Sequence, residues 1–311
     1  MDEASLERVR DAWRQVLGAP AAFREPGTVV VARPARPAPG PRWVTVVTLG
    51  GSRCVVLPAD LAADLAAADR DAAADRDAAA TLTDGPDRGT IDRDPAGTPT
   101  DVPDRDSAGR DPAGTPTGGP DRGTVGRVGD QVGGLDAAVA GRLAHPDEAR
   151  AMLGPRIVVL GPAVLAFTSD LQPNPVPSPA EPAEPGAADL DQLGAACDPG
   201  DATESGLAAW THWIHMVRER DVVVAAAGAQ VWAGTLAHLG VLTRPDRRGQ
   251  GLGIMVASSV VRAALAAGLV AQWRARVELT ASRRLAASLG FIELGGQVSY
   301  HLPGASPDHG R

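Results

Sequence analysis

One glycine-rich turn of the sequence combines the residue types that bind a phosphate. An apolar run over residues 239–243 predicts a strand, and a helix is predicted over residues 254–267. Between them, glycines alternate with other residues over 249–253, and three arginines crowd the turn: Arg244, Arg247 and Arg248. A strand, a glycine-rich turn and a helix direct free backbone N–H groups and a helix dipole toward an anion. The segment therefore predicts a site for a phosphate-bearing ligand.

The spacing of the turn excludes two common kinds of phosphate site. A Walker-type loop ends in Gly-Lys-Ser/Thr, and this chain contains no lysine. A dinucleotide-binding G-x-G-x-x-G begins directly at its strand, whereas five residues, 244–248, precede the first glycine here. The pattern that remains over residues 248–253 is R-x-x-G-x-G.

With that pattern the sequence resembles the GCN5-related N-acetyltransferases, the GNAT superfamily, whose acetyl-CoA signature is Q/R-x-x-G-x-G/A. A second segment, ASRRLAASLGF at residues 281–291, resembles the family's A-S-x-x-x-A-x-x-L-G-F. The two motifs together make the resemblance fairly specific. It covers about residues 187–303 and implies an α/β (α+β) fold with a mixed, mostly antiparallel sheet flanked by helices.

The resemblance also implies how acetyl-CoA, as co-substrate, would be held. In the family the fourth and fifth strands splay apart, and backbone groups of the fourth strand bind the pantetheine arm, here near Gly240. Backbone N–H groups of the glycine turn wrap the pyrophosphate. The implied cofactor-binding residues are Leu239, Val241, Thr243, Arg247, Arg248, Gly249, Gln250, Gly251, Leu252, Gly253 and Thr280.

The sequence indicates less clearly which residues would bind and activate the acceptor amine. Direct acetyl transfer to a primary amine needs a general base and a proton donor for the departing thiolate. The tyrosine that the family often places four residues before the L-G-F glycine is Ala286 here. The catalytic candidates are therefore His238, Glu278 and Ser282. Each has a simpler structural alternative, such as a buried histidine or a helix-capping serine.

An acetyl-CoA-dependent N-acetyltransferase is the leading hypothesis, acting on a small-molecule or peptide amine. The alternative is a non-catalytic acyl-CoA-binding regulatory module, since the family's acid–base residues are incomplete. An interaction protein is a third hypothesis.

The composition of the chain limits which partners and which cellular location we expect for this activity. A net charge of −8 argues against a nucleic-acid partner. Two lone cysteines, Cys54 and Cys197, form neither a disulfide framework nor a metal site. The N-terminus lacks a signal-peptide core, and no apolar run approaches the ~20 residues of a membrane span. We expect a cytoplasmic protein without metal or membrane partner, and leave a homodimer open.

The rest of the chain is expected to form further parts. Residues 1–67 and 132–170 are predicted as a smaller N-terminal α/β domain, with strands that include 156–160 and 163–167. Residues 68–131 repeat DRDAAA and RDPAGTPT, which cannot bury a core, so a disordered insertion is predicted there. Residues 171–186 form a proline-rich linker and residues 304–311 a tail.

Within the acetyltransferase-like part, residues 187–303, the pattern predicts these elements. Helices are expected over 187–196, 206–219, 254–267 and 282–289, with a polar loop up to residue 205. Strands are expected over 222–226, 230–233, 236–243 and 269–275, with turns at Gly228 and Gly234. A terminal hairpin of 291–294 and 297–302 is expected to turn at Gly295-Gly296.

Overall fold

The computed structural model describes residues 1–33, 42–83, 135–171, 181–182 and 187–303. The chain forms two compact units, residues 1–68 with 127–311, and residues 69–126. All the strands of the described residues lie in the first unit. Within the described residues, no helix combines the length and apolar character needed to cross a bilayer.

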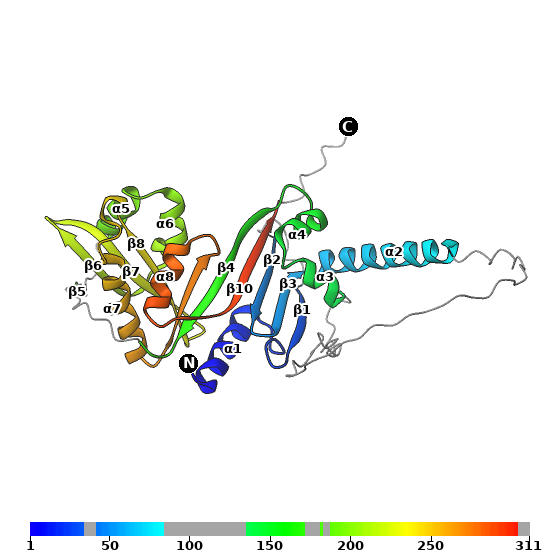
Figure 1. The fold of residues 1–311 in the computed structure, drawn as a ribbon, viewed down its shortest axis with the longest axis horizontal. Helices are drawn as coiled ribbons and strands as arrows, with labels where there is room; N and C mark the ends of the chain where they lie inside the picture. The colour runs from blue at the N-terminus through cyan, green and yellow to red at the C-terminus, as the bar shows by residue number, and fades with distance from the viewer. Residues whose placement is uncertain (34–41, 84–134, 172–180, 183–186, 304–311) are drawn as a thin grey trace, which may run out of the picture. The chain divides into compact units, whose positions relative to one another are not determined.

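Ten strands form one mixed sheet in the first unit, in the order β1-β3-β2-β10-β4-β9-β8-β7-β6-β5 (Figure 1). Only the β1–β3 and β8–β9 pairs are parallel, so the predicted mostly antiparallel sheet is confirmed. The strands are β1 Gly27–Arg33, β2 Arg42–Leu49, β3 Ser52–Pro58, β4 Val158–Thr168, β5 Glu181–Pro182, β6 His212–Glu219, β7 Val222–Trp232, β8 Leu236–Thr243, β9 Val270–Arg276 and β10 Ile292–Leu302.

Helices cover both faces of the sheet. They are α1 Glu3–Leu17, α2 Ala59–Thr83, α3 Ala137–Arg142, α4 Pro146–Leu153, α5 Ala187–Ala195, α6 Pro199–Ser205, α7 Leu252–Ala266 and α8 Thr280–Ser288, with 3₁₀ turns η1 Leu207–Ala209 and η2 Pro245–Arg247. Because side chains alternate along β8, Ala237 packs with α7 and α8 while its neighbour Leu236 packs with α1 on the other face. This alternation decides which side chains of β8 face which layer of helices.

The last strand, β10, joins the two parts of the chain that the sequence separates. It pairs antiparallel with β2 on one side and β4 on the other. The predicted hairpin at Gly295-Gly296 is therefore wrong, because both glycines lie within one strand. A Cβ on Gly295 would come 1.8 Å from the carbonyl oxygen of Thr48, so close approach of β2 explains the glycine. The predicted domain boundaries stay a prediction, but strands from both parts share one sheet.

Strand β4 is also continuous where the sequence predicts a break. Gly161-Pro162 is a cis peptide inside the strand, and the register against β10 shifts there. A Cβ on Gly161 would lie 2.9 Å from the carbonyl oxygen of Gln297. The glycine and proline therefore mark an irregularity in the strand and not its end.

The predicted helix over residues 206–219 is wrong. Helix α6 lies before this segment, in the predicted polar loop. Within 206–219, residues His212–Glu219 form strand β6, which pairs with β7. Gly206 ends α6 with a φ of +67°. The apolar residues at helical spacing are shared between a turn and a strand, so the sheet overrides the local pattern.

Gly228 lies inside β7, opposite Gly240 of β8, and not at the predicted turn. A Cβ on Gly228 would meet the ring of Trp210 at 2.9 Å, and one on Gly240 would come 2.3 Å from its Nε1. The indole therefore packs directly on the backbone of two adjacent strands. This packing explains Gly228, and at Gly240 the carbonyl oxygen of Ser205, 1.8 Å from an added Cβ, also leaves no room for a side chain.

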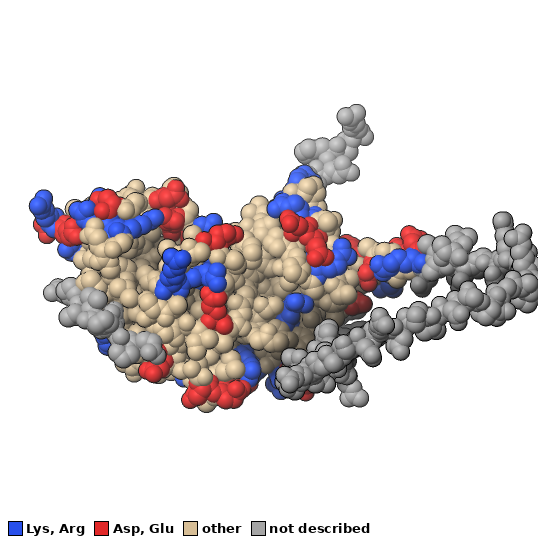
Figure 2. Space-filling model, in the orientation of Figure 1, with Lys and Arg blue, Asp and Glu red and all other residues tan. Residues whose placement is uncertain are grey.

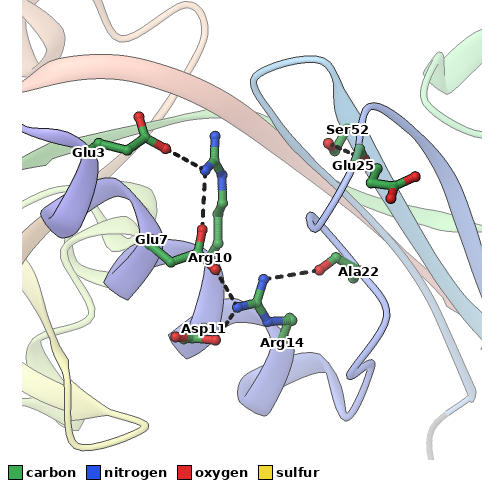
Figure 3. A network of polar contacts seen from close by, with 8 residues as sticks. All are labelled: Glu3, Glu7, Arg10, Asp11, Arg14, Ala22, Glu25 and Ser52. Carbon is green, nitrogen blue, oxygen red and sulfur yellow. Dashed lines mark hydrogen bonds and ion pairs between the residues drawn. The ribbon is translucent and has the colours of Figure 1, made fainter.

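An ion-pair network holds the polar side of α1 (Figure 3). Arg14 contacts Glu7 at 2.7 Å and also the carboxylate of Asp11, and its Nη1 donates to the carbonyl oxygen of Ala22 at 3.5 Å. Trp13, the residue before Arg14, is buried against the sheet. The network thus ties the helix to the turn that follows it.

Helix α2 extends into the region that the sequence predicts as a disordered insertion. It runs to Thr83 and includes both DRDAAA copies, whereas residues 84–131 lie outside the described residues. Among the described residues in view, arginine and acidic side chains are interspersed over the surface (Figure 2).

Candidate functional site

The two central parallel strands separate partway along their length. β8 and β9 pair from Leu236↔Val270 to Leu239↔Trp273 and no further. β8 continues to Thr243, still paired with β7, and β9 continues to Arg276, still paired with β4. The edges of the two strands that face each other beyond Leu239 are therefore free of ladder hydrogen bonds. Such an edge offers backbone donors and acceptors to a ligand.

A cleft of about 540 Å³ opens at this separation, within the usual size of a ligand site. Its walls come from the end of β8, the glycine turn, the start of α7, β9 and α8, with α6 contributing acidic side chains. The cleft is thus built from both motifs that the sequence singles out.

The glycine turn has the backbone geometry of an anion site. Gly249 and Gly251 have φ values of +77° and +79°, which glycine adopts without strain. The first backbone bond of α7 runs from Met255 N to the carbonyl oxygen of Gly251 at 3.1 Å. The N–H groups of the preceding helical residues, 252–254, therefore have no acceptor within the helix. They lie at the positive end of the helix dipole and beside the cleft.

The arginines of the turn already have carboxylate partners. Arg248 Nη2 lies 2.7 Å from Asp201, and Arg247 Nε lies 2.9 Å from Glu219. A phosphate would have to compete with these carboxylates, so the backbone groups provide the simpler anion contact.

Nine of the predicted cofactor-binding residues line the cleft, and two do not. The lining residues are Leu239, Val241, Thr243, Arg247, Arg248, Gly249, Gly251, Leu252 and Gly253. Gln250 and Thr280 are exposed and do not line it. Of the catalytic candidates, Ser282 lines the cleft, whereas Glu278 is exposed beyond β9 and His238 lies beside the lining on β8. The roles of all these residues stay predictions.

His238 is held in one tautomer by a buried relay. The indole N–H of Trp13 can only donate, and it donates to Oε1 of Gln272 at 3.1 Å. The amide nitrogen of Gln272 therefore faces Nδ1 of His238, 3.1 Å away, and donates to it. Nδ1 is thus an acceptor, and the neutral ring carries its proton on Nε2. The ring also stacks on Trp232, with centroids 4.2 Å apart.

Burial, and then the positive charge of Arg274, lower the pKa of His238 to about 3. The imidazole is therefore neutral near pH 7, and its Nδ1 lone pair is already used. These two properties suit a hydrogen-bond donor better than the general base predicted from the sequence.

Ser282 keeps a proton that it can donate. Its Oγ accepts a hydrogen bond from the indole N–H of Trp273 at 3.0 Å, so its own O–H points elsewhere. The residue before α8 is Leu279, and no side chain caps this helix. The capping alternative for Ser282 is therefore not observed.

Two acidic residues of α6 belong to the cleft and were not predicted from the sequence. Besides Asp201, these include Glu204, whose Oε1 accepts from the backbone N–H of Arg276 at 3.2 Å and whose Oε2 lies 3.5 Å from its Nε. The Asp198-Pro199 pair, an N-cap followed by proline, is a signal that could have found the helix. Its contact with the cleft has no local signal. Arg274 of β9 also lines the cleft and was not singled out.

Comparison with known proteins identifies the family that this part of the chain resembles. Residues 215–296 match the family model of the GNAT acetyltransferases, so the resemblance seen in the C-terminal half is confirmed. No curated protein matches the chain.

Several solved structures are similar over about half of the chain or less. A GNAT-family protein from Novosphingobium aromaticivorans is 25% identical, with a TM-score of 0.38 over 49% of this chain and 70% of that one. A GNAT-family acetyltransferase from Colwellia psychrerythraea is 15% identical, with a TM-score of 0.36 over 47% of this chain and 57% of its own length. A Salmonella typhimurium protein solved with its cofactor acetyl-CoA is 24% identical, with a TM-score of 0.25 over 31% and 69%. The chain thus spans less than two thirds of the Colwellia protein.

Proposed function

We propose that the chain is an acetyl-CoA-dependent N-acetyltransferase that moves an acetyl group directly to a primary amine. The observation that carries the proposal is the separation of β8 and β9 beside the glycine turn, within the segment that matches the family model. A free strand edge and an anion site at one end of the same cleft suit a long ligand with a diphosphate.

In this proposal different residues bind different parts of acetyl-CoA. The unpaired N–H groups of residues 252–254 and the open backbone at Gly249 and Gly251 receive the pyrophosphate. The free edge of β8, at Val241 and Thr243, receives the pantetheine arm. Acetyl-CoA supplies an acetyl thioester whose carbonyl carbon is the electrophile.

Transfer forms a C–N bond and breaks the C–S bond. The attacking amine must be neutral and must lose one proton, and the departing thiolate must gain one. Glu204 is the carboxylate in the cleft that we propose receives the amine proton, because His238 has no free lone pair on Nδ1. The hydroxyl of Ser282, which is free to donate, is proposed as the donor to sulfur.

The test is thiol release from acetyl-CoA by the purified protein, measured with a panel of primary amines, together with calorimetry of acetyl-CoA binding. We expect acceptor-dependent release, strongly reduced in Glu204→Gln and Ser282→Ala while acetyl-CoA binding is kept. Tight binding without release by any amine would favour the non-catalytic acyl-CoA-binding module instead.

A further inference from the structure

Two arginines that line the cleft, Arg274 and Arg284, have no side-chain ion pair or hydrogen bond within the described residues, and Arg284 is exposed to solvent. Arg274 is half-buried, and its guanidinium has neither an ion pair nor a hydrogen bond within that part of the chain. Its neighbours differ, since Arg276 pairs with Glu204 and Arg248 pairs with Asp201. A guanidinium that loses part of its hydration without gaining an acceptor is costly, so this position suggests a ligand.

The position of Arg274 in β9 decides on which face of the sheet its side chain lies. The last residue of β9 that pairs with β8 is Trp273, whose side chain packs with α7 and α8. Arg274 is the next residue, so it faces the other side of the sheet, with Gln272 and His238. It is therefore the first side chain on that face beyond the point where the strands part.

The electrostatic effect of Arg274 on His238 agrees with this placement. The positive charge of Arg274 is the second cause, after burial, of the lowered pKa of His238. The two side chains therefore lie close enough to interact across the strands. A cationic donor that lines the cleft and a neutral N–H donor beside the lining then lie near each other.

We infer that the acceptor amine also carries an anionic oxygen group, a carboxylate or a phosphate, which binds Arg274. The inference rests on the proposed function, since it names the class of amine that the same cleft takes. A guanidinium presents a planar fork of N–H donors that matches either group with two hydrogen bonds.

The cleft offers opposite charges to the two ends of such a molecule. The carboxylates of α6, Glu204 and Asp201, line the cleft together with Arg274. Glu204 is already hydrogen-bonded to Arg276 and so leaves Arg274 unneutralised. An amine lacking the anionic group would leave the guanidinium unpaired on binding, and the site would select against it.

The experiment compares matched acceptors in the thiol-release assay. Alanine and phenylalanine are each compared with their carboxamide and with the corresponding amine that lacks the carboxyl group. Phosphoethanolamine is compared with ethanolamine to test a phosphate group in the same way. Calorimetry of the same compounds on the protein, with and without saturating CoA, gives a second measurement that does not need turnover.

We expect amines that bear a carboxylate or a phosphate to have a higher kcat/KM than their neutral counterparts. The pair that shows this difference identifies which anion binds Arg274. Arg274→Gln should raise the KM of these acceptors about tenfold to a hundredfold, with kcat changed less and neutral amines unaffected. Arg274→Lys should restore part of the binding. The matched control is Arg262→Gln, an exposed arginine of α7 outside the cleft lining, which should leave KM unchanged.

Two results would overturn the inference. One is equal kcat/KM for the charged and neutral members of every pair, and the other is an Arg274→Gln variant that binds the charged acceptors as well as wild type does. Acetyl-CoA binding and the acetylation of neutral amines test the proposed function separately. A protein that acetylates neutral amines but binds no anionic one would keep the function and lose the inference.

Discussion

The indole N–H of Trp13 donates a hydrogen bond to Oε1 of Gln272, a residue 259 positions later in the chain. Gln272 in turn donates to His238, so a helix at the N-terminus fixes the tautomer of a histidine beside the cleft. Both Trp13 and Gln272 are buried. The N-terminal part of the chain therefore helps to orient a residue that lies beside the cleft.

Replacing Gln272 with leucine should destabilise the protein, because the buried Trp13 N–H would lose its acceptor. We expect the free energy of unfolding to fall by about 1–3 kcal/mol, measured by urea titration. Gln230→Leu is the matched control. It removes a similar bond, from Trp232 Nε1 at 2.8 Å, at a half-buried place where water can substitute. Equal losses in the two variants would contradict a special role for the relay.

The stability of the protein should fall as the pH drops below 6.5, because His238 resists protonation in the folded state. Its pKa is about 3 when folded and near 6.5 when unfolded. Between these values the unfolded chain binds more protons, so acid favours unfolding and stability rises with pH. Between pH 7 and 5 the histidine should contribute a loss of about 1–2 kcal/mol, given its partial exposure.

The variant His238→Gln isolates this contribution, since glutamine keeps an acceptor for Gln272 and cannot titrate. Urea midpoints of the two proteins at pH 7 and pH 5 are compared. The wild type should lose more stability than the variant over this interval. An identical loss in both proteins would show that His238 is protonated as easily in the folded state as in the unfolded one.

The glycine turn allows a matched test of the phosphate site. Gly251 begins α7 with a φ of +79°, and Gly268 follows its end with a φ of +76°. A Cβ meets nothing within 4 Å at either place, so alanine should cost each position a similar strain of about 1–2 kcal/mol. Only Gly251→Ala should also weaken acetyl-CoA binding, by about tenfold, in calorimetry. An equal loss of affinity in Gly268→Ala would show that the effect comes from stability alone.

The sequence predicts well those parts of the site whose residues lie close together in the chain. Residues 236–243 form the predicted strand, and the glycines at 249 and 251 have the positive φ values that a tight turn needs. The nine cleft-lining residues among the predicted cofactor set come from these two segments. Local geometry and local sequence agree here, so the prediction succeeds.

The parts that sequence misses depend on neighbours far away in the chain. Gly228 and Gly295 look like turn residues, but each lies inside a strand. Each is a glycine because a group that is distant in sequence, Trp210 or Thr48, leaves no room for a Cβ. Glu204 and Arg274 have no local signal either. Their place in the cleft follows from the sheet order and from the point where β8 and β9 part.

Asp201 is expected to compete with the pyrophosphate for Arg248. Its carboxylate lies 2.7 Å from the guanidinium, and both residues line the cleft. Removing the charge with Asp201→Asn should free the arginine for the diphosphate and tighten acetyl-CoA binding about threefold to tenfold at low salt. The gain should shrink as the salt concentration rises, because both groups are partly exposed. Asp189→Asn, which breaks the separate pair with Arg218, should leave the affinity unchanged. Unchanged affinity in Asp201→Asn as well would mean that Arg248 does not reach the ligand and that the backbone N–H groups hold the diphosphate alone.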